Sequence, residues 1–280
     1  MRLRVSTVLV GHVRPDFMRA NEEIGKLFSA AAHRAIHDTV IVDNSRPRID
    51  FERVDGQTVV VGGDNSMREF TAWDRGLAYL ERERRNPDLI HLATSAYDAL
   101  YTDYLPKFGE RVLYAVWRAG AALGHIDYYD EPVEILGRRS QSWIRTSYVF
   151  APARSIDSLR SLVSFEDRAS LFSGDPAAPF RSDAPICPRY QQYILSWLTG
   201  EGTGQGVVWH SRFDLSSDTL DLFETKAMAI LNEHLFSLRL REAGTPVVDV
   251  TWLAGMLERV DADAIDWKTG WQDQINARPA

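Results

Sequence analysis

The chain has 280 residues, of which 45% are hydrophobic and 25% charged, the composition of a globular protein with a core. Its formal net charge of −7 argues against a nucleic-acid-binding protein, because such proteins usually present a basic surface to phosphates. The single cysteine, Cys187, excludes an internal disulfide and a thiolate metal cluster. No apolar run approaches the ~18 residues of a transmembrane segment. We therefore expect a cytoplasmic protein, which could touch the inner face of a membrane through a lipid-linked substrate.

The first half of the chain alternates β-rich runs with helical patterns. Four runs predict strands, at Val5–Val10, Thr39–Val42, Thr58–Val61 and Leu89–Ala93. Apolar residues at helical spacing predict helices over Phe17–Ala31 and Phe70–Leu80. This alternation favours an α/β fold with a mostly parallel sheet and helices on both faces. Ligands of such sheets bind beyond the carboxyl ends of the strands.

The second half has a different character. The pattern predicts a helix over 106–123 and strands at 133–136 and 147–150, on either side of the basic segment 137–143. A proline-rich loop or lid is expected at 172–188. A long helix follows at 220–242 and ends before Gly244. The polar tail after Trp267 is expected to be loosely held.

Small polar residues follow each strand of the predicted parallel sheet, where a ligand would bind. The candidate ligand contacts are Gly11, His12, Asp43, Ser45, Asn65, Arg68, Arg75, Thr94 and Ser95. Local roles also suit several of them. Asp43 could form an Asx turn, Ser66 and Glu69 a capping box, and Thr94 or Ser95 a helix cap.

These segments, in this order and spacing, resemble the GT-A nucleotide-sugar glycosyltransferases, particularly the branch close to rhamnan-synthesis and other surface-polysaccharide transferases. The resemblance covers roughly residues 1–160. The matching elements are the opening strand, the turn Val42-Asp43-Asn44-Ser45, the helix start Asn65–Leu77, the strand Leu89–Ala93 and the acceptor-side segment Gly137–Phe150.

The resemblance implies a GT-A-like, Rossmann-related fold with a helical C-terminal part. Residues 1–125 would form the nucleotide-sugar-binding half. Residues 126–280 would supply the acceptor-side strands, the lid loop and the C-terminal helices of the same domain. The implied activity is transfer of a sugar from a nucleotide-sugar donor to a saccharide or lipid-linked acceptor in surface polysaccharide synthesis. Asp43 would then face the nucleotide, and Asn65, Arg68 and Arg75 would line the donor site. The sequence specifies neither the sugar nor the oligomeric state.

The segment after the fourth strand departs from the family pattern. The family has acidic residues there that bind Mg²⁺ or Mn²⁺, whereas this chain has Ala93-Thr94-Ser95-Ala96, with Asp98 as the nearest carboxylate. Three possibilities follow. Asp98 could take the place of the acidic metal ligands, catalysis could have been lost, or arginines could neutralise the leaving diphosphate without a metal. The arginines available are Arg68, Arg75, Arg138 and Arg139. We favour metal independence, and no paired His or Cys spacing predicts a zinc site.

An inverting transfer needs a base that accepts the proton of the attacking hydroxyl. The candidates are Asp98, Asp127, Asp130 and Glu131, with Glu233 and His234 as later options. We expect the segment 127–131 instead to be an exposed acidic loop before the strand at Val133. Arg138, Arg139 and Trp143 are candidates for acceptor binding, although Trp143 could instead pack in the core.

Two other functions stay open. The chain could be a catalytically silent GT-A-like protein that binds a sugar nucleotide or acts as a scaffold, as the missing acidic motif suggests. It could also be a nucleotidyltransferase-like enzyme on a similar sheet. That enzyme would need a glycine-rich phosphate loop after the first strand, where Gly11–Pro15 supplies one glycine.

Overall fold

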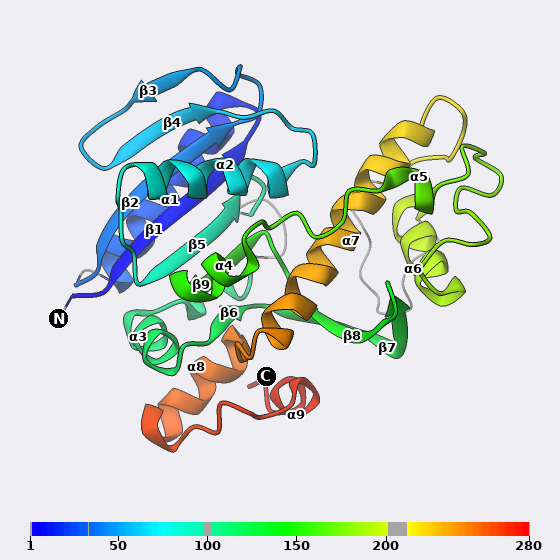
Figure 1. The fold of residues 1–280 in the computed structure, drawn as a ribbon. Helices are drawn as coiled ribbons and strands as arrows, with labels where there is room; N and C mark the ends of the chain where they lie inside the picture. Colours follow the sequence, from blue (N-terminus) through cyan, green and yellow to red (C-terminus); the bar gives the residue numbers. More distant parts are fainter. Residues whose placement is uncertain (1, 33, 98–101, 201–211, 280) are drawn as a thin grey trace.

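The computed structural model describes residues 2–32, 34–97, 102–200 and 212–279. Its centre is an eight-stranded sheet with the order β10-β6-β9-β5-β1-β2-β4-β3 (Figure 1). The strands are β1 (Arg4–Gly11), β2 (Ile36–Asp43), β3 (Phe51–Arg53), β4 (Thr58–Gly62), β5 (Leu89–Thr94), β6 (Ala122–Gly124), β9 (Tyr148–Pro152) and β10 (Val247–Asp249). β5, β1, β2 and β4 run parallel, as do β6 and β10, whereas β3 and β9 are antiparallel to their neighbours. The predicted mostly parallel α/β sheet is confirmed.

Helices cover both faces of this sheet (Figure 1). The helices are α1 (Arg14–Ala31), α2 (Glu69–Arg82), α3 (Glu110–Ala119), α4 (Ala153–Leu159), α5 (Arg168–Leu171), α6 (Pro188–Thr199), α7 (Leu220–Glu242), α8 (Val250–Arg259) and α9 (Trp271–Asn276), with 3₁₀ turns η1 (Leu105–Lys107) and η2 (Ala262–Ala264). Side chains of α1, α3 and α8 form one core cluster with the sheet. Side chains of α2, α4 and the end of α7 form a second.

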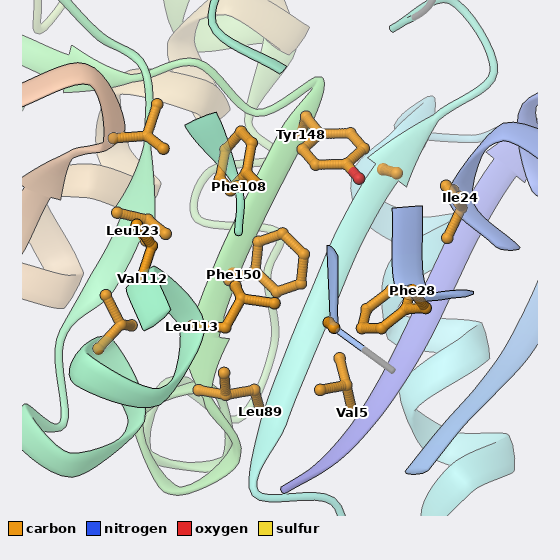
Figure 2. Close-up of a cluster of buried hydrophobic side chains, with 14 of the residues drawn as sticks. Val5, Ile24, Phe28, Leu89, Phe108, Val112, Leu113, Leu123, Tyr148 and Phe150 are labelled. Carbon is orange, nitrogen blue, oxygen red and sulfur yellow. The ribbon is translucent and has the colours of Figure 1, made fainter. Parts of the chain in front are cut away.

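The first cluster is rich in aromatic rings, as Figure 2 shows. Phe150 of β9 lies 5.3 Å from Phe108 and 6.4 Å from Phe28 between ring centroids. Tyr148 on the same strand lies 5.0 Å from Phe108. Burying rings of this size supplies much of the hydrophobic stabilisation. β9 therefore joins the N-terminal strands to the C-terminal half in one core.

A separate hairpin, β7 (Ile126–Ile135) with β8 (Arg138–Ile144), extends from the sheet and packs on α6 and α7 (Figure 1). Its third core cluster is aromatic: Trp143 lies 4.6 Å from Tyr129 and 5.5 Å from Trp197 between ring centroids. α7 links this cluster to the main sheet, because its residues belong to both the second and the third clusters. Within the described residues, no helix is long and apolar enough to cross a membrane.

Three expectations for residues 106–143 were wrong. The helix expected over 106–123 ends at Ala119, because Gly120 adopts a left-handed conformation with φ of 68° and residues 122–124 form the buried strand β6. The basic segment 137–143 is not a connection between strands; most of it is strand β8. The acidic segment 127–131 is not a loop, because it lies within strand β7. Helix α7 has the predicted bounds, 220–242.

The glycine at the end of β4 allows a close backbone approach. A Cβ atom at Gly62 would collide with the carbonyl group of Pro47, which belongs to the main chain and cannot rotate away. We expect Gly62→Ala to lower the free energy of unfolding by about 1–3 kcal/mol, the usual cost of overpacking. Urea denaturation measures this loss. Gly56→Ala is the control, because nothing lies within 4 Å of its Cβ position; an equal effect of both substitutions would contradict the prediction.

Three histidines make the fold sensitive to acid: His91 and His234 are fully buried, and His37 is half-buried. Thr7 Oγ1 lies 2.8 Å from His37 Nε2 and 3.0 Å from His91 Nδ1. Burial lowers the pKa of His37 from 6.5 to about 4, that of His234 to about 3, and that of His91 well below its usual range. At a pH below 6.5 but above these lowered pKa values, the three histidines are protonated in the unfolded chain and neutral in the folded chain. The stability present above pH 6.5 is lost as the pH falls.

The size of this loss follows from the proton count. Near pH 5.5 the three histidines take up about three protons on unfolding, while Glu233, whose pKa is raised to about 7, releases about one. Burial also raises the pKa of Glu69, so the net uptake is at most about two protons, and stability falls by up to about 3 kcal/mol per pH unit. Chemical denaturation from pH 7 to 5 measures the slope, and His37→Gln should reduce it by about half. A flat profile over this range would contradict the prediction.

Candidate active site

The loops that follow β1, β2, β4 and β5 meet at the carboxyl edge of the sheet, as the sequence predicts. The backbone N–H of Asn44 donates to the Gly11 carbonyl over 2.9 Å, and the backbone N–H of Gly63 donates to the Asp43 backbone carbonyl over the same distance. The Ser95 amide donates to the Val10 carbonyl over 2.8 Å. His12 is exposed beside these contacts. Backbone hydrogen bonds therefore hold the four loops together.

Asp43 does not offer a free carboxylate to a ligand. Its side chain is buried, and Oδ1 accepts hydrogen bonds from the Ser45 amide over 2.9 Å and from the Ser45 hydroxyl over 2.6 Å. Oδ2 lies 3.1 Å from Arg46 Nε, and Arg46 in turn pairs with Glu52. The carboxylate and the Ser45 hydroxyl are thus used within the loop. This is the Asx turn that was expected as the alternative role of Asp43.

Asn44, which the sequence did not single out as a contact, lies at the centre of the edge. Its Nδ2 lies 3.3 Å from Asn65 Oδ1 and 3.4 Å from the Arg68 carbonyl. Its Oδ1 is buried and has no hydrogen-bond partner among the described residues. A buried acceptor without a partner is costly unless a ligand or water supplies a donor. The predicted neighbours Asn65 and Arg68 do lie together here.

The start of α2 differs from the predicted capping box. The Ser66 hydroxyl donates to Asp64 over 2.8 Å, and α2 begins at Glu69 without a side-chain cap. Arg68 immediately before the helix has a positive φ of 52°, a strained conformation for a residue with a side chain. Arg75, one of the predicted donor contacts, donates to the Arg48 carbonyl over 2.8 Å.

The segment after β5 offers hydroxyl groups rather than carboxylates. Thr94 and Ser95 are half-buried, and the Thr94 amide donates to the Ser147 carbonyl over 3.1 Å. Asp98 lies outside the described residues. Among the residues that the structure describes, no group of three or more His, Cys, Asp or Glu side chains is placed to hold a metal ion. The hydroxyls at this strand end do not fit the carboxylate ligands that Mg²⁺ or Mn²⁺ prefers.

Asp127 at the start of β7 belongs to an ion-pair cluster. Arg145 Nε and Nη2 donate to its two carboxylate oxygens, each over 2.9 Å. His125 Nε2 lies 3.5 Å from Oδ1, and the His125 ring stacks on Tyr104 at 4.8 Å. Although burial raises the pKa of Asp127, hydrogen bonding and charge from His125 and Arg145 lower it overall. Asp127 is therefore poorly suited to accept a proton.

Glu233 on α7 has the opposite electrostatic balance. Its Oε1 accepts hydrogen bonds from the Thr146 amide over 2.7 Å and from the Thr146 hydroxyl over 3.0 Å. Burial raises the pKa of Glu233 from 4.5 to about 7; the Thr146 bonds oppose the increase, and the charges of Asp127 and Glu69 add to it. A carboxylate that titrates near neutral pH can both accept and release a proton.

The remaining predicted residues lie elsewhere. Asp130 and Glu131 are exposed on β7. Arg138 and Arg139 are exposed at the start of β8, and Arg138 pairs with Glu242 at 3.3 Å. They are seven and six positions before Arg145, about 20 Å along an extended strand.

Trp143 is not available to an acceptor. Its side chain is 4% exposed and packs in the aromatic core of the hairpin, with its ring 4.2 Å from the His234 ring. His234 is itself fully buried and bonds the Tyr190 hydroxyl over 2.7 Å. The structure shows Trp143 packed in the core, which is one of the two roles that the sequence left open for it.

Comparisons with known proteins give remote similarities. No family model matches the chain, and no curated protein matches it significantly. Among solved structures, 2-C-methyl-D-erythritol 4-phosphate cytidylyltransferase from Thermus thermophilus is 15% identical over 97% of this chain and 96% of its own, with a TM-score of 0.36. A mannosyltransferase from Pyrobaculum calidifontis, in complex with GDP-Man and Mn²⁺, is 9% identical over 94% of this chain and 78% of its own, with a TM-score of 0.37. At these scores and identities, no family is assigned.

Proposed function

We propose that the protein transfers a sugar from a nucleotide-sugar donor to a hydroxyl of a saccharide or lipid-linked acceptor, in the synthesis of a surface polysaccharide. The observation that carries the proposal is the Glu233 carboxylate, whose pKa is raised to about 7 and which is fixed by Thr146 near the carboxyl edge of a mostly parallel sheet. The polysaccharide context rests on the resemblance of the sequence motifs. Glu233 takes the role for which Asp98, Asp127 and Asp130 were the first candidates.

In the proposed reaction, the acceptor oxygen attacks the anomeric carbon of the donor sugar. The bond from that carbon to the diphosphate oxygen breaks, and the diphosphate leaves with the bonding electron pair. Glu233 accepts the hydroxyl proton through the carboxylate oxygen that Thr146 does not hold. Attack from the side opposite the leaving group inverts the anomeric configuration.

The loops at the sheet edge would hold the nucleotide. Asn65 is exposed beside Asn44, whose side-chain oxygen is buried and without a hydrogen-bond partner among the described residues. The exposed ring of His12 and the hydroxyls of Thr94 and Ser95 lie on the neighbouring loops. Amides and hydroxyls of this kind recognise the edges of a base and the hydroxyls of a ribose by hydrogen bonds.

A panel of donors tests this proposal. The purified protein is incubated with UDP-, GDP-, dTDP- and CMP-sugars, with EDTA or with Mn²⁺, and both thermal stabilisation and release of the nucleotide are followed. We expect one nucleotide class to raise the melting temperature and one of its sugars to be consumed. Stabilisation without turnover, with any acceptor offered, would favour the catalytically silent alternative. Absence of stabilisation by every donor would contradict nucleotide-sugar binding altogether.

A further inference from the structure

Strand β3 forms one edge of the main sheet, with β4 beside it and its other side open (Figure 1). The Asp50 carbonyl and the Val54 N–H, on either side of β3, each bond to β4 over 3.0 Å. Alternate residues of an antiparallel strand direct their backbone groups to opposite sides. Phe51 and Arg53 therefore direct their N–H and C=O groups away from β4, to the open edge.

Apolar side chains gather at this edge. Of the five large hydrophobic side chains that are exposed among the described residues, three lie here. Phe51 in β3 is 51% exposed, and Ile49, two positions earlier, is 91% exposed. Val13 directly precedes Arg14, whose guanidinium bonds Glu52 of β3. Open backbone groups beside exposed apolar side chains are the features of a strand edge that pairs with another chain.

Charges on an edge strand usually prevent such pairing, but the charges of β3 do not oppose it. Arg14 donates to the two oxygens of Glu52 over 2.9 and 2.6 Å, and Arg46 donates to one of them over 2.9 Å. The carboxylate is thus neutralised within its own subunit. Phe51 and Arg53 are two positions apart, so their side chains share the opposite face of the strand.

We propose that two copies of this chain associate by antiparallel pairing of their β3 strands about a two-fold axis at Glu52. Phe51 of one copy then lies opposite the partner's Arg53, and the outward N–H of each residue donates to the carbonyl of the other. The guanidinium can also lie over the phenyl ring as a cation–π contact. The strand is therefore complementary to itself in this register.

The two-fold arrangement fixes the size of the assembly. Both copies use the same patch, so pairing consumes the open edge of each and stops at a dimer. A three-residue strand with a few flanking side chains makes a small interface, which is typical of weak, reversible association. The dimer should therefore form as the protein concentration rises. The inference does not depend on the proposed activity.

Sedimentation of the full chain over roughly a thousandfold range of concentration measures the association. Arg53→Pro removes an N–H that points to the open edge, and proline is tolerated in edge strands, so the pairing of β3 with β4 remains. We expect this substitution to raise the dissociation constant of the dimer about tenfold or more, because each dimer loses two hydrogen bonds. Arg53→Thr keeps the N–H and should weaken the dimer less. Melting temperatures confirm that the variants fold.

A disulfide tests the register. In a Cys187→Ser background, Glu52→Cys places two thiols opposite each other across the axis, at a separation that a disulfide spans. We expect mild oxidation to cross-link this variant as a dimer. Gly56→Cys is the control, because Gly56 is equally exposed but lies in the turn beyond β3, away from the axis.

A wild-type chain that stays monomeric at every concentration, or that grows beyond a dimer, would overturn the proposal. A dimer that Arg53→Pro leaves as tight as the wild type would assign the association to another surface and overturn it as well. Equal cross-linking of the Glu52→Cys and Gly56→Cys variants would contradict the two-fold register. Concentration-dependent dimers that Arg53→Pro weakens and that cross-link selectively at position 52 support it.

Discussion

Glu233→Gln is expected to lower the turnover of the donor by about 10²- to 10⁴-fold, the contribution of a positioned general base. The glutamine side chain has the size of the carboxylate and can still accept the hydrogen bond from the Thr146 backbone N–H, but it cannot accept a proton at neutral pH. Donor binding should change little, because the nucleotide loops contain no part of Glu233. Initial rates at saturating donor, together with donor affinity from thermal stabilisation, separate the two effects.

The pH profile gives an independent test of the same residue. Glu233 must be ionised to act as a base, so the wild-type rate should rise with pH, be half-maximal near pH 7 and level off at higher pH. Thr146→Val removes the hydroxyl donor, which stabilises the ionised carboxylate, and should shift the profile to higher pH. Asp130→Asn, at an exposed position on β7, is the control. A Glu233→Gln enzyme with the rate and profile of the wild type would exclude Glu233 as the base.

The sequence predicts the first half of the fold well, because short and long periodicities alternate there without ambiguity. The β-branched runs of β1, β2, β4 and β5 appear as buried parallel strands, with the polar loops together at one edge. Parallel strands are buried on both faces, so their continuous apolar runs are easy to recognise. The three-residue edge strand β3 was missed because its residues carry no such pattern.

The second half was harder to predict for a different reason. Strand β6 is three residues long and directly follows a helix with similar apolar residues, so periodicity alone could not separate the two. Most of the basic segment 137–143 is strand β8, in which Ser140 and Ser142 face inward while the arginines at its start are exposed. Small polar residues on the inner face hid the alternation that marks a strand.

The site itself depends on contacts between distant residues. Glu233 and Thr146 are 87 positions apart, and nothing in either local sequence signals that they bond. The pKa of Glu233 is raised mainly by burial, which only the packing of α7 against the sheet creates. For Asp43, the sequence predicted the position at a strand end correctly. It did not predict that the carboxylate accepts a hydrogen bond from the Ser45 hydroxyl and pairs with Arg46.

The C-terminal segment, expected to be loosely held, is instead bound to the centre of the molecule. Arg278 Nε lies 3.0 Å from Asp249 Oδ1, and its Nη2 lies 2.6 Å from Oδ2 and 2.7 Å from the Ile126 carbonyl. Asp249 is fully buried at the start of α8 and also accepts from the Ile126 and Trp252 amides. The guanidinium therefore neutralises a carboxylate that water does not reach.

Arg278→Ala should lower the free energy of unfolding by about 3 kcal/mol, the low end of the cost of leaving a buried charge without its partner, because two backbone amides still bond Asp249. Urea denaturation measures the loss, and Arg259→Ala is the control, since this arginine is exposed. Combining Arg278→Met with Asp249→Asn should cost less than the sum of the single changes, because no unpaired charge remains.

Arg278→Ala should also change the pH dependence of the proposed active site. Ile126, which bonds both Asp249 and Arg278, directly precedes Asp127 in β7, so the segment fixes the strand that carries the Asp127–Arg145 pair. Asp127 contributes to the raised pKa of Glu233, and a displaced Asp127 would let that pKa fall. In Arg278→Ala, the rise of the rate with pH should therefore begin at a lower pH than in the wild type. A destabilised variant with an unaltered pH profile would show that the C-terminal segment supports the fold but not the site.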